Sequence, residues 1–289
     1  MDGVPLLQMG AALVLNAGFA WLAGAVMARR WLLGCPPGLV NRVLPVLRRS
    51  AVLAALAALL ATGASLWAAA ALMGDVSLRE GWVMLPTVAT GTEYGHMGLM
   101  AMAAMATLAV LMGTRSDWLP AAAMLLVFAL ARGCISHAGE MGVPSTEYCL
   151  EVVHLLLVGV WLGGVAVAAW IVLPAARRSG IAIAPYLQAL STAATFALAG
   201  IVASGVFNAC QRLDSLSQLT ASTWALALVA KLVLFAAAVL LGAYNRWWGF
   251  PGAGGDGGAR AMLMLRIESI VLVAALAAAA CLTVQPPPG

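Results

Sequence analysis

Long apolar stretches follow one another along the whole chain, and only short polar connections separate them. A helix needs about 20 residues to cross the hydrocarbon core of a bilayer, whereas a barrel strand needs about 10 residues of alternating polarity. Eight stretches reach about 18 residues or more, so the pattern predicts eight transmembrane helices and no strands. The expected spans are residues 5–27, 50–73, 92–113, 118–137, 148–173, 184–208, 221–245 and 261–284.

The composition agrees with this pattern. Hydrophobic residues make up 63% of the 289 residues and charged residues only 9%, a balance that a water-solvated globule does not tolerate. We therefore expect an all-α polytopic membrane protein in which residues 1–289 form a single transmembrane domain, because no connection is long enough for a soluble domain. The longest connections are residues 28–49 and 249–258, and residues 40–46 are expected to lie along the membrane interface.

Basic residues are distributed unevenly among the connections. Ten lie in one alternate set of connections and two in the other. Because cytoplasmic connections carry the excess of Lys and Arg, both termini are expected in the periplasm, and these arginines indicate topology rather than nucleic-acid binding. The ten are Arg29, Arg30, Arg42, Arg48, Arg49, Arg115, Arg177, Arg178, Arg246 and Arg260, and the two are Arg79 and Arg212.

The three histidines all fall at predicted external ends of helices, and each has a glutamate three residues away. On a helix this spacing places the imidazole and the carboxylate on one face. Ionisable groups inside a membrane usually serve function, so these pairs form the candidate site, with solvated boundary residues as the alternative explanation. The pairs are Glu93 with His96, Glu140 with His137, and Glu151 with His154.

Methionines accompany two of the pairs, since Met97 and Met100 share the face of His96 and Met141 follows His137 by one turn. Thioether and imidazole suit Cu(I), whereas carboxylate and imidazole suit Cu(II), so copper in either oxidation state is the expected ligand. The chain has 14 methionines, and apolar filling is the competing explanation for each of them.

The fifth predicted helix carries a polar stripe that descends from the external surface. Glu147, Glu151 and His154 are followed on the same face by Val158 and Trp161. A cation entering from outside would meet Glu147 first, so we expect this residue on an entry route. Glu151 has no Arg or Lys nearby in sequence, and its ionised form is expected to be costly until a cation binds.

Four further polar residues fall inside predicted helices without an assigned role. Lys231 needs a partner in the membrane, and Glu268 is one candidate, although their estimated depths differ by about two turns. The five cysteines show no C-x-x-C spacing and are expected as small buried residues, with a Cys210–Cys281 disulfide left open. The four polar residues are Arg132, Asn208, Lys231 and Glu268.

Several stretches resemble the copper resistance protein D (CopD) family of bacterial inner-membrane proteins. The likeness is strongest over residues 184–284, which resemble the family's shared domain, and the first half agrees by helix count. The family pattern often has Asp where this chain has Glu151. The stretches are ISHA at 135–138, EVVHLL at 151–156, VWLGG at 160–164, SGVFN at 204–208, KLVLF at 231–235 and GAYNR at 242–246.

This resemblance implies copper handling at the inner membrane. The leading hypothesis is a non-enzymatic, copper-binding permease that moves copper from the periplasm toward the cytoplasm, and the chain has no ATP-binding loop. One alternative is a b-type haem oxidoreductase with two of the histidines as axial ligands, and another is a copper chaperone or sensor without transport. The expected partners are the copper ion and the lipid bilayer, with a periplasmic copper-binding protein as a candidate.

Overall fold

The computed structural model describes residues 3–114, 117–136, 139, 142–212, 223–251 and 257–282. These residues form helices and no strand, which confirms the predicted all-α class. The helices are α1 (Val4–Leu32), α2 (Pro37–Met73), α3 (Leu78–Gly91), α4 (Glu93–Gly113), α5 (Trp118–Cys134), α6 (Thr146–Val167), α7 (Leu173–Ser179), α8 (Ala184–Arg212), α9 (Thr223–Tyr244) and α10 (Gly257–Leu282). Two π-helical segments, η2 (Ala168–Val172) and η4 (Asn245–Gly249), continue α6 and α9.

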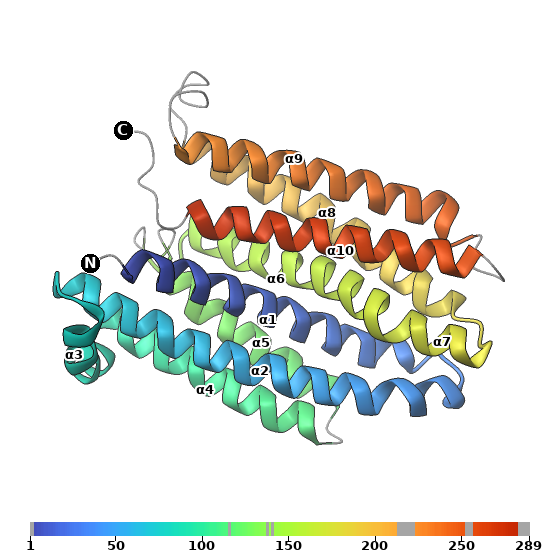
Figure 1. The fold of residues 1–289 in the computed structure, drawn as a ribbon, viewed down its shortest axis with the longest axis horizontal. Helices are drawn as coiled ribbons and strands as arrows, with labels where there is room; N and C mark the ends of the chain where they lie inside the picture. Colours follow the sequence, from blue (N-terminus) through green and yellow to red (C-terminus); the bar gives the residue numbers. More distant parts are fainter. Residues whose placement is uncertain are drawn as a thin grey trace.

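All eight predicted spans correspond to apolar helices of a multi-pass membrane protein. Within the described residues, seven helices are long and apolar enough to cross a membrane, and α5 is a shorter apolar helix of 17 residues. Figure 1 shows the long helices side by side, with α1 and α6 in the interior of the bundle. α1 packs against α2, α6 and α10, whereas α9 packs mainly against α10.

The contact between α1 and α6 depends on two glycines. A Cβ atom on Gly24 would overlap the Gly163 carbonyl, and one on Gly163 would overlap the Ala20 carbonyl. Small residues allow such close approach where lipid provides no hydrophobic drive between helices. Next to this crossing, the stacked rings of Phe19 and Phe128, with centroids 5.1 Å apart, join α1 to α5.

The connection expected at residues 28–49 is mostly helix, which corrects the interfacial segment that we predicted there. α1 continues to Leu32 and α2 already begins at Pro37, a residue type well suited to the first helical position. Leu39, Val43 and Leu47 are fully buried and share one face of α2. Burial of this face against the bundle extends the helix beyond the apolar run of residues 50–73.

Helix α3 was not predicted, because residues 78–91 are too short and too polar for a span. Ser77 begins α3 with a capping box, in which its hydroxyl accepts from the Glu80 backbone and the Glu80 carboxylate accepts from the Ser77 backbone N–H. Trp67 of α2 donates its Nε1–H to the Leu78 carbonyl at 2.7 Å and meets Trp82 edge to face. These contacts hold α3 against the C-terminal end of α2.

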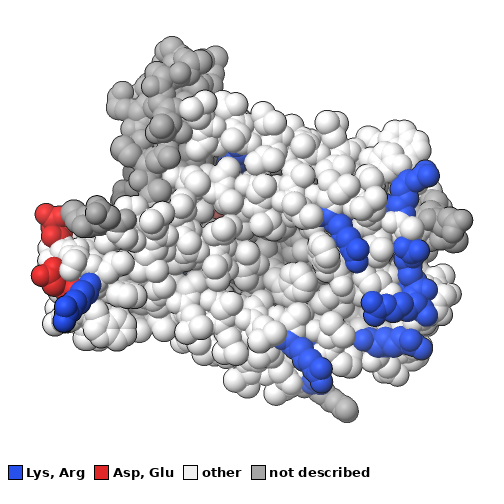
Figure 2. All heavy atoms as spheres, in the orientation of Figure 1, with Lys and Arg blue, Asp and Glu red and all other residues white. Residues whose placement is uncertain are grey.

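Charged side chains separate toward the two ends of the bundle. Figure 2 shows acidic residues at the left end, where Figure 1 shows that α1 begins and α10 ends, and most basic residues toward the right. At the basic end, Arg29 donates to the Met112 carbonyl at 2.7 Å and Arg48 to the Thr114 carbonyl at 3.1 Å, which satisfies the end of α4. Assignment of the basic end to the cytoplasm follows from the positive-inside rule and stays a prediction.

Candidate functional site

The imidazole of His154 projects from α6 toward α8. Its Nδ1 atom is 2.8 Å from the hydroxyl oxygen of the buried Ser204. The Ser204 hydroxyl lies 2.7 Å from the Gly200 carbonyl and 3.2 Å from the Ile201 carbonyl. When it donates its one hydrogen to either carbonyl, its oxygen accepts from His154. In that arrangement the proton of a neutral His154 lies on Nδ1 and the Nε2 lone pair is available, which is the form in which a histidine binds a metal.

Charged groups from three helices surround this imidazole. Glu151, one turn above on α6, interacts electrostatically with His154 and with Arg132 of α5, and Lys231 of α9 interacts electrostatically with His154. No Arg or Lys lies near Glu151 in sequence, but the fold brings Arg132 of α5 beside it. The neighbourhood combines one carboxylate with two cations, so a bound metal ion would have to compete with Arg132 for Glu151 and would lie near the positive charge of Lys231.

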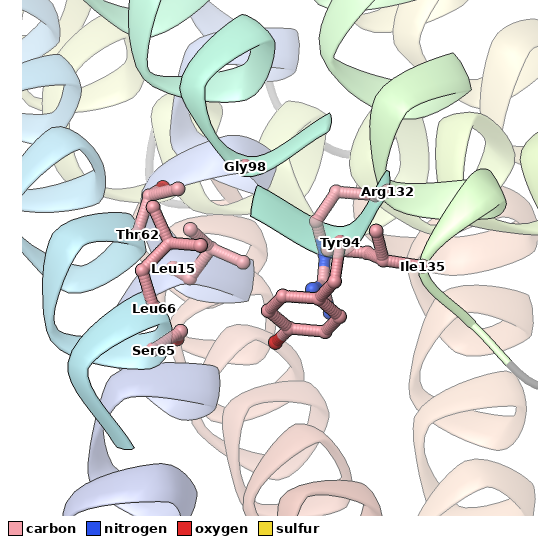
Figure 3. A pocket seen from close by; sticks show the side chains of 8 residues that line it. All are labelled: Leu15, Thr62, Ser65, Leu66, Tyr94, Gly98, Arg132 and Ile135. Carbon is pink, nitrogen blue, oxygen red and sulfur yellow. The ribbon is translucent and has the colours of Figure 1, made fainter. Parts of the chain in front are cut away.

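Arg132 also contacts the beginning of α4. Figure 3 shows its side chain extending toward the ring of Tyr94, and both residues line a cavity of about 10 Å³ together with Thr62 and Ser65 of α2. A space of this size holds about one water molecule. Since Arg132 interacts with both Tyr94 and Glu151, it links the beginning of α4 electrostatically to the beginning of α6.

His96 occupies a different environment from His154. It is exposed on α4, and its Nε2 atom is 2.9 Å from the Thr90 carbonyl at the end of α3. Glu93 is also exposed, whereas Met97 and Met100 are half-buried, and Met100 packs against the apolar core. α4 packs against α2, α3 and α5, and α6 against α1, α5, α8 and α10, so the two histidines belong to helices that have only α5 as a common neighbour.

The candidate ligands are only partly assembled in the part of the chain that the structure describes. No group of three or more His, Cys, Asp or Glu side chains suited to a metal ion occurs among the described residues. His137, Glu140 and Met141 lie outside those residues, as does the side chain of Asn208, so their roles stay predictions. The described part of the predicted cluster therefore consists of two separate His–Glu pairs.

A second polar centre lies deep in the bundle around Glu268 of α10. Only 1% of this residue is exposed. Trp161 of α6 donates its Nε1–H to one carboxylate oxygen at 3.2 Å, and the Asn245 amide donates to the other at 3.1 Å. Both hydrogen-bond donors to the Glu268 carboxylate are neutral side chains, and the candidate pairing of Lys231 with Glu268 stays a prediction.

The four cysteines whose side chains the structure describes form no disulfide, and the side chain of Cys210, for which a disulfide with Cys281 was left open, lies outside the described residues. Cys281 is a free thiol 3.4 Å from the Met9 sulfur, and Cys134 lies 3.8 Å from the Tyr148 hydroxyl. Burial raises the pKa of the Cys35 thiol in the α1–α2 connection, which keeps it protonated and unreactive. Cys149 is exposed, contrary to the expectation that the cysteines are buried.

Comparison with protein families identifies the last third of the chain. Residues 184–282 match the family model described as Copper resistance protein D. The chain carries a CopD domain. This match confirms the resemblance to the family, and the protein is a copper-resistance-related, multi-pass membrane protein. Comparison with curated proteins and with solved structures returns no match.

The CopD domain comprises α8, α9, η4 and α10, and helix α6, which lies outside the match, completes both polar centres. His154 of α6 meets Ser204 of the CopD domain, and Trp161 of α6 meets Glu268. Sequence reasoning missed Ser204 and Asn245 as functional candidates, although both lie in stretches that resemble the family. A neutral hydroxyl or amide inside an apolar helix is a weak signal until its partner is known.

Proposed function

We propose that the protein binds copper in the bacterial inner membrane and moves it from the periplasm toward the cytoplasm. The observation that carries this proposal is the orientation of His154, whose Nδ1 atom is bound to Ser204 so that Nε2 is available as a ligand. The CopD domain favours copper over other metals that imidazole and carboxylate bind.

In this proposal His154 and Glu151 are the central ligands, because they lie together within the membrane at the junction of α6 and the CopD domain. His96, with Glu93, belongs to an outer binding site at the exposed end of α4, where copper first leaves water. Glu147 lies on the entry route above Glu151. The remaining proposed ligands are His137, Glu140, Met97, Met100 and Met141.

The polar stripe of α6 suggests the direction of movement. Glu147, Glu151 and His154 descend along one face, and the same face reaches Trp161, whose indole donates to Glu268. A cation that leaves His154 would thus move along α6 toward the interior of the CopD domain. No enzymatic step is proposed, since copper is the cargo of the site.

Copper binding by single variants tests the ligand assignment. Replacement of His154, His96 or His137 by Ala should lower the copper affinity of the purified protein by at least about tenfold, the scale expected for partners of a metal site. Glu80→Gln, an external acid outside the proposed site, is the matched control and should bind like the parent. Parental affinity in two of the three histidine variants would show that the cluster is not a site.

The pH dependence of the same measurement tests Glu151. Because imidazole and carboxylate must lose their protons to bind a metal, copper affinity should rise with pH. Glu151→Gln should weaken binding and flatten this dependence, whereas Glu151→Asp, which keeps the charge, should preserve both. A parental pH profile in Glu151→Gln would remove the carboxylate from the site.

Two readouts distinguish the alternatives. A Soret band in the visible spectrum would favour the haem hypothesis, but the cavity beside Arg132 and Tyr94 is lined by no histidine and is too small for that cofactor. Copper uptake into proteoliposomes should depend on His154, whereas stoichiometric copper binding without uptake would favour a chaperone or sensor. We expect uptake, and no Soret band.

A further inference from the structure

Glu268 lies near the middle of a membrane-spanning helix. It is about 16 Å along the axis from the first residue of α10 and about 21 Å from the last. Its carboxylate is almost completely shielded from solvent and lipid. Both recorded donors, the Trp161 indole and the Asn245 amide, are neutral. A full negative charge at this depth is costly without a cation or a proton to neutralise it.

The cations on the elements that pack against α10 are engaged elsewhere. Arg266, on α10 itself, lies 4.7 Å over the Trp170 ring and donates to the Ala169 carbonyl. Arg246 of η4 donates to Ser191 and Thr195 of α8. Arg29 of α1 donates to the Met112 carbonyl, and Lys231 of α9 acts on His154. Neither is among the groups that interact with Glu268, which are Asn245 and Trp161. The same holds for the remaining titratable or charged groups on these elements, which are the exposed Arg30, Arg177, Arg178 and Arg260, and Glu147, Tyr148, Cys149, Glu151, His154, Tyr244 and Cys281.

Two glycines leave room for the polar groups of this centre. A Cβ atom on Gly242 would lie 3.1 Å from a Glu268 carboxylate oxygen, and one on Gly249 would lie 2.8 Å from the Asn245 side-chain oxygen. The π-helical segment η4 begins at Asn245, and such segments are frequent at functional sites. The backbone of α9 and η4 is therefore shaped around the Glu268–Asn245 pair.

The amide of Asn245 lacks one hydrogen bond while Glu268 is ionised. Asn245 is 1% exposed, and among the described residues its Oδ1 atom has no partner. An ionised carboxylate only accepts hydrogen bonds, so it satisfies the amide N–H but not the amide oxygen. A protonated carboxyl group carries an O–H donor, which the Asn245 oxygen can accept after the amide turns by half a rotation. The pair thus has one hydrogen-bonded arrangement for each protonation state.

We propose that Glu268, Asn245 and Trp161 form a proton-binding site in the middle of the membrane. The site binds and releases a proton without copper, so it stands apart from the copper ligands. Its place at the end of the α6 stripe would couple proton movement to the inward movement of copper, and this coupling alone rests on the proposed function.

Infrared difference spectroscopy of the copper-free protein, reconstituted in nanodiscs and titrated in pH, tests the proposal. The parent should show a carboxylic-acid carbonyl band that disappears as the pH rises, and Glu268→Gln should lack it. Glu151→Gln, which removes a membrane glutamate of the α6 stripe, is the matched control and should keep it. A parent without such a band, or a band that persists at every pH, would overturn the proposal.

Variants of the donors keep the test independent of whether Glu268→Gln folds. Trp161→Phe removes a hydrogen bond to the ionised carboxylate, so it should raise the proton affinity of Glu268 about tenfold and move the band's midpoint by about one pH unit. Asn245→Ala also removes the acceptor of the carboxyl O–H, so it should move the midpoint by less than Trp161→Phe does. An unmoved midpoint in both variants would contradict the assignment. A band that depends on sodium at constant pH would show a metal-cation site and would also overturn it.

Failure of the proton-binding site can be distinguished from failure of the copper site. Glu268→Gln should bind copper with parental affinity, because it leaves His154 and Ser204 unchanged, but uptake into proteoliposomes should no longer respond to a pH gradient. Loss of the infrared band in Glu268→Gln together with normal copper binding supports the proton-binding site, whether or not His154 is a copper ligand.

Discussion

A single hydroxyl group decides which nitrogen of His154 can bind a metal. Ser204→Ala removes the acceptor of the Nδ1–H, so the imidazole can rotate and change tautomer, and copper affinity should fall about tenfold. Ser204→Thr keeps a hydroxyl at this position and should bind like the parent. Competition with a copper chelator measures the affinities, and nitrogen chemical shifts of His154 report the tautomer. Equal affinity in Ser204→Ala and the parent would contradict this role.

At the scale of helices, the α1–α6 crossing determines whether the two halves of the bundle pack. Gly163→Ala places a Cβ atom on the Ala20 carbonyl, and the helices must separate to accept it. Overpacking of this kind costs about 1–3 kcal/mol, so the thermal unfolding temperature in detergent should fall by several degrees. Gly10→Ala is the matched control on α1, because nothing lies within 4 Å of its added Cβ atom. Similar unfolding temperatures for the two variants would refute the close contact.

The cap of α3 makes this helix sensitive to acid. Hydrogen bonds from Ser77 hold the pKa of Glu80 below its usual value, so the ionised carboxylate stabilises the folded cap. This contribution is present above the unfolded pKa of about 4.3 and is lost as the pH falls through the lower folded value. Amide hydrogen exchange at residues 78–84, corrected for its intrinsic pH dependence, should accelerate in acid in the parent. Glu80→Gln should remove the dependence, and a parental response in that variant would assign it to another group.

For the whole molecule, the separation of charge predicts the orientation in the membrane. A reporter that is active only outside the cytoplasm should be active when fused at Gly142 or after Gly289 and inactive at Arg178, because the basic connections remain in the cytoplasm. Reporter fusions at all three positions measure this directly. The opposite pattern would place His154 and Glu151 near the cytoplasm and would reverse the proposed direction of copper movement.

Much of the fold could be predicted because lipid imposes a simple rule on the chain. Backbone groups in the hydrocarbon core must form hydrogen bonds within their own segment, so each long apolar run forms a helix. The basic residues in the connections then predict which helix ends lie on the cytoplasmic side. The i, i+3 pair of Glu151 and His154 was visible for the same reason, since helical spacing alone places both on one face. The start of α2 was not predicted because its apolar residues form only one face of the helix, between polar residues, and that face is buried only by the neighbouring helices.

Partners on different helices were decided by the tertiary structure alone. Ser204 lies 50 residues from His154, and Glu268 lies 107 residues from Trp161. In a soluble protein the apolar face of a helix points to the core, but in a membrane both lipid and core are apolar, so the pattern does not tell which faces meet. The amino-acid sequence by itself therefore determined the long apolar helices and the shared helical face of Glu151 and His154. Only the packing of α6 against the CopD domain decided which nitrogen of His154 is available and how Glu268 is bound, because those contacts depend on how small residues let particular helices approach.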